Sequence, residues 1–332
     1  MPVTLRDVAR HLNLSHATVS MVLNDRRDVT IPESTRTRVL EAAKELGYQP
    51  NLSARALASG KTNMIALWSP SSHNSFYAEI LFAIQRLAQG TGKDVLFREV
   101  TFGKEKVKDN LRSLMLPVDG ILAIDSKYAL DALGGQPKMD RKPIVNIGVY
   151  TSDQYDSVHV DLESGARDGL EHLWDSGFRD IGFLTVENSV DTDDPRARAY
   201  KSFCEERQIS HNVIGLKSAV RDYVSSLAAD LVKSQRLPRA LFCYNDHVAM
   251  GVVKGVRDVG VKVPEQCAIV GCDGVAEAEY VDPPLTTIVQ PVEEICRLGW
   301  EFLKERIVDP QMPVRKLVLK PTLVIRKSSR LR

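Results

Sequence analysis

The sequence predicts an α/β fold in which two doubly wound parallel-sheet subdomains follow a small all-α domain. After residue 61, short and nearly continuous apolar runs alternate with helical segments. This alternation is typical of parallel strands that are buried on both faces and joined by crossover helices. Before residue 61, apolar residues recur only at helical spacing. The chain has 332 residues, which is too long for one compact domain and favours two or three.

Composition restricts the class of protein. The net charge is +1 and 43% of the residues are hydrophobic, as in ordinary globular proteins. No apolar run approaches the length of a membrane span, and the N-terminus lacks the basic-then-apolar pattern of a signal peptide. Five cysteines are scattered outside metal-like spacing, so we expect reduced thiols. These features predict a cytoplasmic protein with no membrane partner, no metal and no cofactor.

Three short helices are expected in the first 50 residues. Thr4 and Asp7 have the spacing of a capping box at the start of the first helix, and Ser15 is placed to cap the second. Thr30 and Glu33 suggest another capping box before the third helix. Apolar residues at helical spacing follow each start: Leu5, Val8, Ala9 and Leu12, then Val19, Val22 and Leu23, then Val39, Ala42, Ala43 and Leu46.

The second helix leaves a mainly polar face opposite its apolar stripe. That face consists of His16, Ala17, Ser20, Met21 and Asn24. Two helices joined by a tight turn and braced by a third form a helix-turn-helix unit, whose second helix enters the DNA major groove. Charge adds modest support, because residues 1–61 hold nine Lys or Arg against six Asp or Glu. The alternative is a plain three-helix domain with a solvated polar face.

Four blocks in this region resemble, in order, the DNA-binding headpiece of LacI/GalR-family transcription regulators. They are TLRDVA at 4–9, ATVSMVLN at 17–24, LGYQPN at 46–51 and ARALASGKT at 54–62. The resemblance implies a DNA-binding headpiece over residues 1–50 and a hinge helix or linker over 51–61. An effector-binding and dimerisation core would then occupy residues 62–332.

The resemblance also implies which residues contact DNA. Two positions at the start of the family's recognition helix and a third one turn later contact base edges, and they correspond to His16, Ala17 and Met21. The third position is often Arg, which donates two hydrogen bonds to guanine. Met21 offers apolar contact only, so the operator should differ from the common family pattern. Phosphate contacts are expected from Thr18 and Ser20, and the remaining expected DNA-binding residues are Thr4, Leu5, Ser15 and Asn24.

Residues 52–59 resemble the family's hinge helix. Eight residues are too few to form a stable helix alone in water. The segment should therefore become ordered only on DNA, beside the hinge of a second copy. Leu57 would then insert into the minor groove and Ala54 would lie against it. The alternative is an ordinary linker.

The region after residue 62 is expected to contain two series of strands and helices, divided near Val160. Strands are expected at 64–69, 94–100, 120–125, 143–148, 180–185, 239–245 and 267–273. Helices are expected at 77–88, 164–175, 224–234 and 248–259. The resemblance adds a crossing at 286–290 and a final strand pair around 317–326, as in the type I periplasmic-binding-protein-like fold. The N-subdomain would comprise about 62–160 and 290–318, and the C-subdomain about 161–289 and 319–332.

In open α/β sheets, ligands bind beyond the carboxyl ends of the strands. Asp125, Asn245 and Asp273 end or follow expected strands, so they should lie at this edge. The resemblance implies that Asn245 and Asp273 bind polar groups of an effector and that Arg196 is the family's effector-binding arginine. The other expected effector-binding residues are Phe76, Tyr77, Tyr223 as a stacking aromatic, and Gln290 at the crossover. Arginine, carboxylates and aromatic faces together suit a sugar.

Some of these assignments have alternatives. Asp273 could cap a turn, Tyr223 could be a core aromatic, and Arg198 could be the contact in place of Arg196. Gly148 falls where sugar-binding relatives often have Asp, which leaves room for a phosphosugar or a nucleobase.

The sequence contains no catalytic constellation. We find no glycine-rich phosphate loop, no HExxH metal motif and no Gly-x-Ser-x-Gly elbow, so an enzyme is not expected. The sequence predicts instead a homodimeric transcription regulator, a repressor, that binds double-stranded operator DNA. A small effector, a sugar or sugar derivative, would modulate its operator affinity. The alternative is a periplasmic-type solute-binding protein without DNA function.

Overall fold

The structure, a computed structural model, describes residues 3–50, 56, 60–70, 74–100, 116–134, 142–186 and 194–330. The chain divides into two compact units, Met1–Asn63 and Met64–Arg332. Most of the expected hinge helix, including Ala54 and Leu57, lies outside the described residues.

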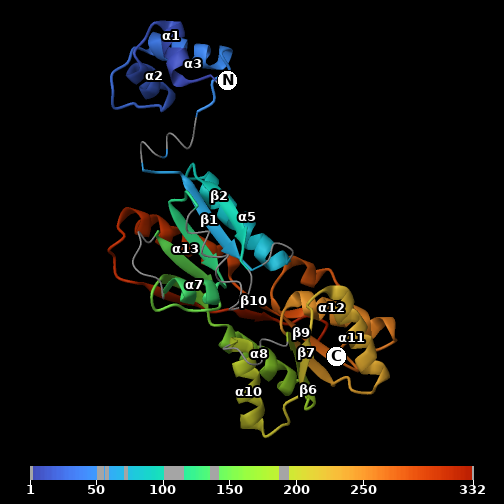
Figure 1. Cartoon of the computed structure of the whole chain (residues 1–332). Helices are drawn as coiled ribbons and strands as arrows, with labels where there is room; N and C mark the ends of the chain where they lie inside the picture. Colours follow the sequence, from blue (N-terminus) through green and yellow to red (C-terminus); the bar gives the residue numbers. More distant parts are fainter. Residues whose placement is uncertain are drawn as a thin grey trace. The chain divides into compact units, whose positions relative to one another are not determined.

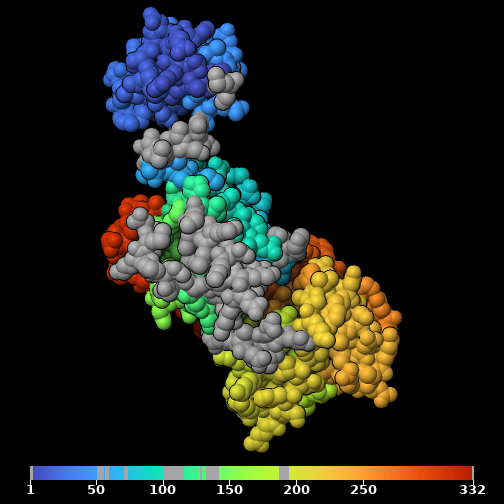
Figure 2. Space-filling view, in the orientation of Figure 1, coloured from blue at the N-terminus to red at the C-terminus, as the bar shows by residue number. Residues whose placement is uncertain are grey.

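Residues 3–50 of the first unit form three packed helices: α1 (Leu5–Leu12), α2 (His16–Leu23) and α3 (Glu33–Glu45). The capping predictions for α1 and α2 are confirmed. The Asp7 carboxylate accepts hydrogen bonds from the backbone N–H and the hydroxyl of Thr4 at 2.9 and 2.6 Å. The Ser15 hydroxyl accepts a bond from the Thr18 N–H at 3.0 Å. In space-filling view, residues 3–50 form one compact body, coloured blue (Figure 2).

The capping box expected at Thr30 is wrong. The third helix begins at Glu33 with Pro32 in the N-cap position, and no side chain caps it. Glu33 is therefore the first helical residue instead of the third, so it cannot complete a box with Thr30.

The second unit contains two six-stranded sheets, which confirms the predicted α/β class with two parallel-sheet subdomains. The first has the order β11-β5-β4-β3-β1-β2 and the second the order β12-β10-β9-β8-β6-β7. Neighbouring strands are parallel except β10 and β12. The first sheet comprises β1 (Met64–Ser69), β2 (Asp94–Glu99), β3 (Gly120–Ile124), β4 (Ile144–Gly148), β5 (Asp156–Val160) and β11 (Lys316–Leu319). The second comprises β6 (Ile181–Val186), β7 (Val213–Leu216), β8 (Ala240–Cys243), β9 (Ala268–Asp273), β10 (Thr286–Val289) and β12 (Thr322–Val324).

Helices cover both faces of each sheet (Figure 1). We call the first sheet with its helices the first lobe. Its helices are α5 (Ser75–Gln89), α7 (Lys127–Gly134) and α13 (Val292–Val308). The second lobe has α8 (Leu162–Asp175) and α10 (Pro195–Arg207) on one face, and α11 (Arg221–Lys233) and α12 (Asp246–Asp258) on the other. A short 3-10 helix, η3 (Ala276–Glu279), follows β9.

The described chain passes between the lobes at three places. It leaves the first lobe between β5 and α8, returns between β10 and α13, and leaves again between β11 and β12. Since β11 pairs with β5 and β12 pairs with β10, the last crossing lies beside the other two.

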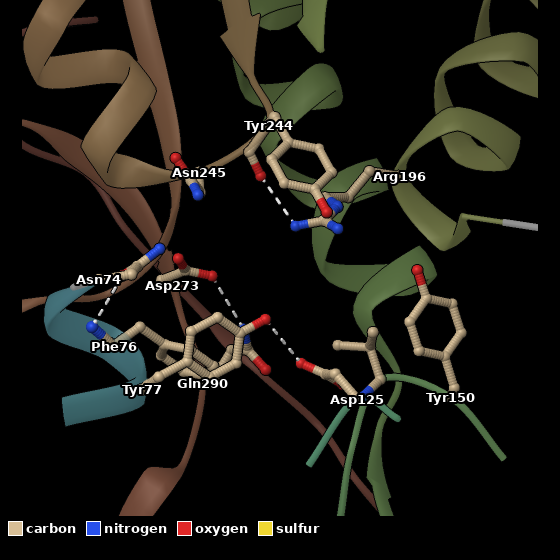
Figure 3. Close-up of a pocket in the computed structure, with 11 residues that line it drawn as sticks. Asn74, Phe76, Tyr77, Asp125, Tyr150, Arg196, Tyr244, Asn245, Asp273 and Gln290 are labelled. Carbon is tan, nitrogen blue, oxygen red and sulfur yellow. Dashed lines mark hydrogen bonds between the residues drawn. The ribbon is translucent and has the colours of Figure 1, made fainter. Parts of the chain in front are cut away.

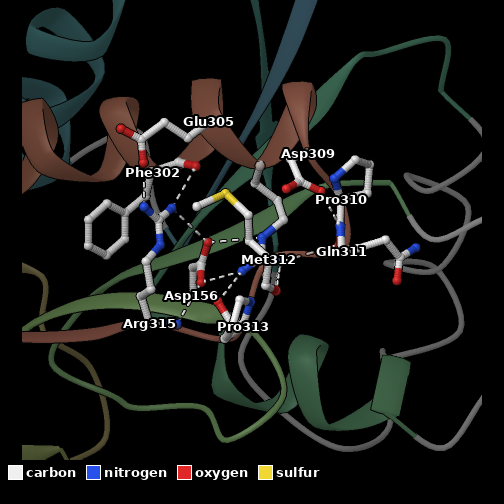
Figure 4. A network of polar contacts seen from close by, with 10 residues as sticks. Asp156, Phe302, Glu305, Asp309, Pro310, Gln311, Met312, Pro313 and Arg315 are labelled. Carbon is white, nitrogen blue, oxygen red and sulfur yellow. Dashed lines mark hydrogen bonds and ion pairs between the residues drawn. The ribbon is translucent and has the colours of Figure 1, made fainter.

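Strand β5 was not predicted, because the polar residues Asp156, Ser157 and His159 interrupt its apolar run. The structure shows why a carboxylate can be buried at its start. Asp156 accepts hydrogen bonds from Arg306 Nη2 at 2.8 Å and from the backbone N–H of Arg315 at 2.8 Å. Arg315 also approaches the same carboxylate with its guanidinium, at 3.3 Å (Figure 4). This network holds α13 and β11 to β5.

Candidate functional site

The helix α2 presents the side chains that were expected to contact base edges. Val19 and Val22 are buried in the core of the first unit, so the opposite face of the helix points outward. His16 and Ala17, in the first turn of α2, are exposed, and Met21, one turn later, is half-buried. These three side chains therefore share the geometry required of a groove-contacting set.

The other expected DNA-binding residues surround this face. The hydroxyls of Thr18 and Ser15 lie 2.8 Å apart, and Asn24 Nδ2 donates to the Ser20 carbonyl at 2.8 Å. Thr4 is exposed at the start of α1. Leu5 differs from these, because its side chain is half-buried and packs against the core of the first unit. The DNA contacts of all these residues stay predictions.

A small enclosed cavity lies between the two lobes, with a volume of about 30 Å³. The structure brings seven of the eight expected effector-binding residues to its wall (Figure 3). The complete lining is Asn74, Phe76, Tyr77, Asp125, Val149, Tyr150, Arg196, Tyr244, Asn245, Asp273 and Gln290.

The first lobe contributes a carboxylate and aromatic faces. Asp125 follows β3 and is held by two donors, the Tyr77 hydroxyl at 3.2 Å and the Val149 N–H at 2.7 Å. Burial raises the pKa of Asp125 above its usual value, against the lowering effect of these hydrogen bonds and of Arg196. The Phe76 and Tyr77 rings meet edge to face, with centroids 5.3 Å apart.

Arg196 dominates the wall of the second lobe. Its Nε and Nη2 donate to the two carboxylate oxygens of Asp194 at 3.0 and 2.7 Å. Its Nη1 donates to the Tyr244 carbonyl at 2.9 Å, and the Tyr244 ring stacks on the guanidinium with its centroid 3.7 Å from Cζ (Figure 3). Arg196 and Asp194 are almost completely buried, with 5% and 1% of their surface exposed.

Asp273 and Gln290 form a polar pair next to this arginine. Gln290 Nε2 donates to Asp273 Oδ1 at 3.0 Å. The Gln290 Oε1 atom is buried and has no hydrogen-bond partner among the described residues. Burial raises the pKa of Asp273 well above its usual value. Asn245 uses its Oδ1 to cap α12 through the Val248 N–H at 2.9 Å, which leaves its amide nitrogen for the cavity.

Tyr223 is not among the residues that line this cavity, so its role as the stacking aromatic stays a prediction. The helix α11 begins at Arg221, so Tyr223 already lies within the helix, one turn before Leu227. Both side chains pack against the hydrophobic core of the lobes. Its half-buried ring fits the alternative of a packing aromatic, and Tyr244 is the aromatic residue of the second lobe that lines the cavity.

The two candidate arginines differ in their surroundings, and Arg198 lines an adjoining pocket that shares Val149 and Tyr150 with the cavity. Arg198 lies outside the enclosed cavity, is 45% exposed and pairs with Glu163 at 2.8 Å. Arg196, two residues earlier on α10, points into the cavity.

Four lining residues were not expected: Asn74, Val149, Tyr150 and Tyr244. The signal for Tyr244 was available, since it directly precedes Asn245 at the end of an apolar run. Tyr150 and Val149 lie in the turn after β4, where sequence pattern carries no information about direction. Asp194 was not expected in the site, because its role depends on hydrogen bonds with Arg196 that the sequence pattern does not reveal.

Within the described ranges, no three His, Cys, Asp or Glu side chains cluster as metal ligands would. The five cysteines are buried thiols. None of the helices described is long and apolar enough to cross a membrane.

Comparison with known proteins identifies two family models in the chain. Residues 4–51 match the model described as bacterial regulatory proteins, lacI family, and residues 170–329 match a periplasmic binding protein-like domain. The ribose operon repressor of Haemophilus influenzae is 30% identical over 98% of both chains. The HTH-type transcriptional repressor PurR of Vibrio vulnificus is 32% identical over 97% of both.

A solved structure of the lac repressor dimer bound to operator and the anti-inducer ONPF superposes with a TM-score of 0.84, at 26% identity and 99% coverage of both chains. The similarity to these relatives and to this solved structure extends over nearly the whole chain, including the headpiece and both lobes. The chain belongs to the lacI family of bacterial regulatory proteins.

Proposed function

We propose that this protein is a cytoplasmic, homodimeric transcription repressor, not an enzyme, and that a small polyhydroxylated effector bound between its lobes sets its operator affinity. The observation that carries this proposal is the enclosed cavity. Donors, acceptors and aromatic faces from both lobes line it, and the same chain carries a helix-turn-helix unit.

The relatives support the DNA half of the proposal. The two relatives described above, at 30% and 32% identity, are repressors by name, and the lac repressor was solved as a dimer on operator DNA. The first turn of α2 exposes His16 and Ala17, with Met21 one turn later. In a dimer, two such helices would occupy successive major grooves of a pseudo-palindromic operator.

The lining of the cavity supports a sugar or sugar derivative as effector. Tyr77, Tyr150 and Tyr244 offer flat faces for C–H groups. Asp125, Asp273 and Gln290 Oε1 offer acceptors, while Arg196 and Asn245 offer donors. Aromatic faces combined with convergent polar groups that fix orientation are typical of small-molecule sites.

The size of the cavity indicates how binding couples to DNA. A cavity of about 30 Å³ has room for about two water molecules, so we expect its walls to move apart when a sugar binds. The lobes are joined across the rim by the Ser75 hydroxyl, which donates to Glu277 Oε1 at 2.6 Å. An effector that changes the spacing of the lobes would shift the population of DNA-binding conformers.

Selection from a random duplex library tests this proposal. The full chain should enrich a sequence with inverted half-sites, and one sugar of a screened panel should change its Kd for that duplex at least tenfold. Arg196→Gln should bind the duplex and lose the response to the sugar, whereas Arg198→Gln should keep both. An unenriched library would contradict the DNA function, and a sugar response unchanged in Arg196→Gln would contradict the assigned site.

A further inference from the structure

The charge of the effector follows from how Arg196 is held, provided that the cavity is the effector site proposed above. An arginine that lines a ligand pocket is ordinarily a receptor for phosphate or carboxylate, because its fork of N–H groups matches two oxygens. In this chain that fork is already occupied. Both carboxylate oxygens of Asp194 receive bonds from Nε and Nη2, so the pair is bidentate.

The remaining donors of Arg196 suit hydroxyl oxygens. Three of its five N–H groups are engaged within the described residues, two with Asp194 and one with the Tyr244 carbonyl. Two N–H groups are left for a ligand, on a guanidinium whose charge is already balanced. The Tyr244 ring stacked on one face prevents the guanidinium from turning toward another partner.

The other charges at the cavity are negative. Asp125 and Asp273 line it, and Arg196 is the one cation among the described lining residues. Asp194 is paired with Arg196, so Asp125 and Asp273 have no cationic partner of their own among the described lining residues. Burial raises the pKa of both Asp125 and Asp273, which means that this wall disfavours negative charge, and an anionic ligand would meet the same cost.

We propose that this site takes an uncharged or cationic polyol and excludes phosphorylated or carboxylated ligands, with Asp194 as the positioning residue that gives Arg196 this selectivity. A sugar or an amino sugar can use the two free N–H groups as donors to its oxygens. Its own hydroxyl or ammonium hydrogens can bind Asp125, Asp273 and the unpartnered Gln290 Oε1. A phosphate dianion brings acceptors only, and among the described lining residues it would meet these three acceptors and no cation other than the paired Arg196.

Inorganic anions test the proposal without knowledge of the natural effector. Thermal unfolding of the full chain is followed against sulfate and phosphate at constant ionic strength, for the native chain, Arg196→Gln and Arg198→Gln. Since the headpiece can also bind anions, the decisive quantity is the difference between the variants. We expect sulfate and phosphate to change the Tm of the native chain and of both variants by the same amount. A saturable rise in Tm that Arg196→Gln removes and Arg198→Gln retains would overturn the proposal.

Asp194→Asn provides the complementary gain of function. It keeps the shape of the side chain and removes the compensating charge, so sulfate should now raise Tm saturably, and the rise should vanish in the double variant Asp194→Asn/Arg196→Gln. A folded Asp194→Asn protein without this gain would contradict the role of Asp194. If Asp194→Asn does not fold, the comparison of the native chain with Arg196→Gln still decides whether the arginine is an anion site.

Matched ligand pairs separate this inference from the proposed function. Ribose, glucose and glucosamine are compared with ribose 5-phosphate, glucose 6-phosphate and glucosamine 6-phosphate for binding to the native chain. Where either member binds, the phosphate ester should bind at least tenfold more weakly; equal or tighter binding of the ester would overturn the charge rule. If no sugar and no ester binds, the effector class in the proposed function fails, while the anion experiment still decides the role of Asp194.

Discussion

The carboxylate of Asp125 occupies the space that a side chain at position 148 would need. A Cβ built on Gly148 would lie 2.1 Å from Asp125 Oδ1, and Gly148 has a φ of +119°, which L-residues rarely adopt. Asp125 directly follows the neighbouring strand β3, and its carboxylate fits beside Gly148 because Gly148 has no side chain.

Gly148→Ala should therefore damage both stability and ligand binding. The backbone strain alone is expected to cost about 1–3 kcal/mol of unfolding free energy, and the methyl group would also displace Asp125. Gly177→Ala is the matched control, because Gly177 also has a positive φ, +92°, but no atom lies within 4 Å of its Cβ position. Urea unfolding and titration with the effector measure the two effects. Equal losses of stability and intact ligand binding in both variants would contradict the steric relationship.

Tyr244→Leu should weaken effector binding at least tenfold, because it removes the ring that holds Arg196 in place. Cation–π contacts of this kind contribute about 0.5–2 kcal/mol, and the ring also forms part of the cavity wall. Tyr223→Leu is the matched comparison on α11. It should lower stability slightly and leave binding unchanged, since Tyr223 packs in the core. Calorimetric titration of both variants decides between the two tyrosines, and stronger loss in Tyr223→Leu would support Tyr223 as the stacking aromatic.

Asp156→Asn should destabilise the fold by up to about 3–5 kcal/mol at pH 7, because it removes a fully buried carboxylate that two partly buried arginines share. Burial raises the pKa of Asp156, but the hydrogen bonds from Arg306 and Arg315 outweigh it, and the net pKa lies below the usual value. The stabilisation is therefore present above the unfolded-state pKa of about 4 and is lost as the pH falls through the lower folded-state pKa.

Urea unfolding at several pH values measures this effect. The difference in unfolding free energy between native protein and Asp156→Asn should be constant from pH 7 to pH 5 and narrow below pH 4. Asp153→Asn is the control, because Asp153 is exposed and pairs with Lys316 at the surface. It should leave stability unchanged at every pH. If the difference in unfolding free energy between the two proteins stays constant below pH 4, the charge of Asp156 does not contribute to stability.

Met21→Arg should change which half-site is preferred instead of weakening all sites equally. Met21 lies on the outer face of α2, where an arginine could donate two hydrogen bonds to guanine, a contact worth about 1–3 kcal/mol of discrimination. Thr37→Arg adds the same charge on the exposed side of α3. Repeating the library selection with both variants tests the role. If the two variants select the same sequences, Met21 does not contact a base edge.

The sequence predicted the buried strands well because their apolar character is local. The expected β1 matches the observed bounds, and β3, β4, β8 and β9 are shifted by one or two residues at their ends. Strands β5 and β7 were missed, since β5 buries polar residues and β7 lies at the edge of its sheet. In both, tertiary partners replace the local apolar signal.

Positions at strand ends could be predicted for the same reason. Asp125, Asn245 and Asp273 come directly after or at the end of apolar runs, and parallel strands bring such residues to one edge. Tyr150 and Asp194 could not be predicted, because their places depend on the path of turns between elements. The assignment of Tyr223 came from the family resemblance alone, and in the structure this residue lies in the first turn of α11, away from the lining of the cavity.

The crossing from β11 to β12 has a consequence for engineering. Only Lys320 and Pro321 separate two strands that belong to different sheets. Each lobe is therefore assembled from segments that are not contiguous in the chain, and no single cut releases an intact lobe. A chimaera that borrows the effector specificity of a relative must exchange β12 together with 162–289, whereas the headpiece can be exchanged with one junction.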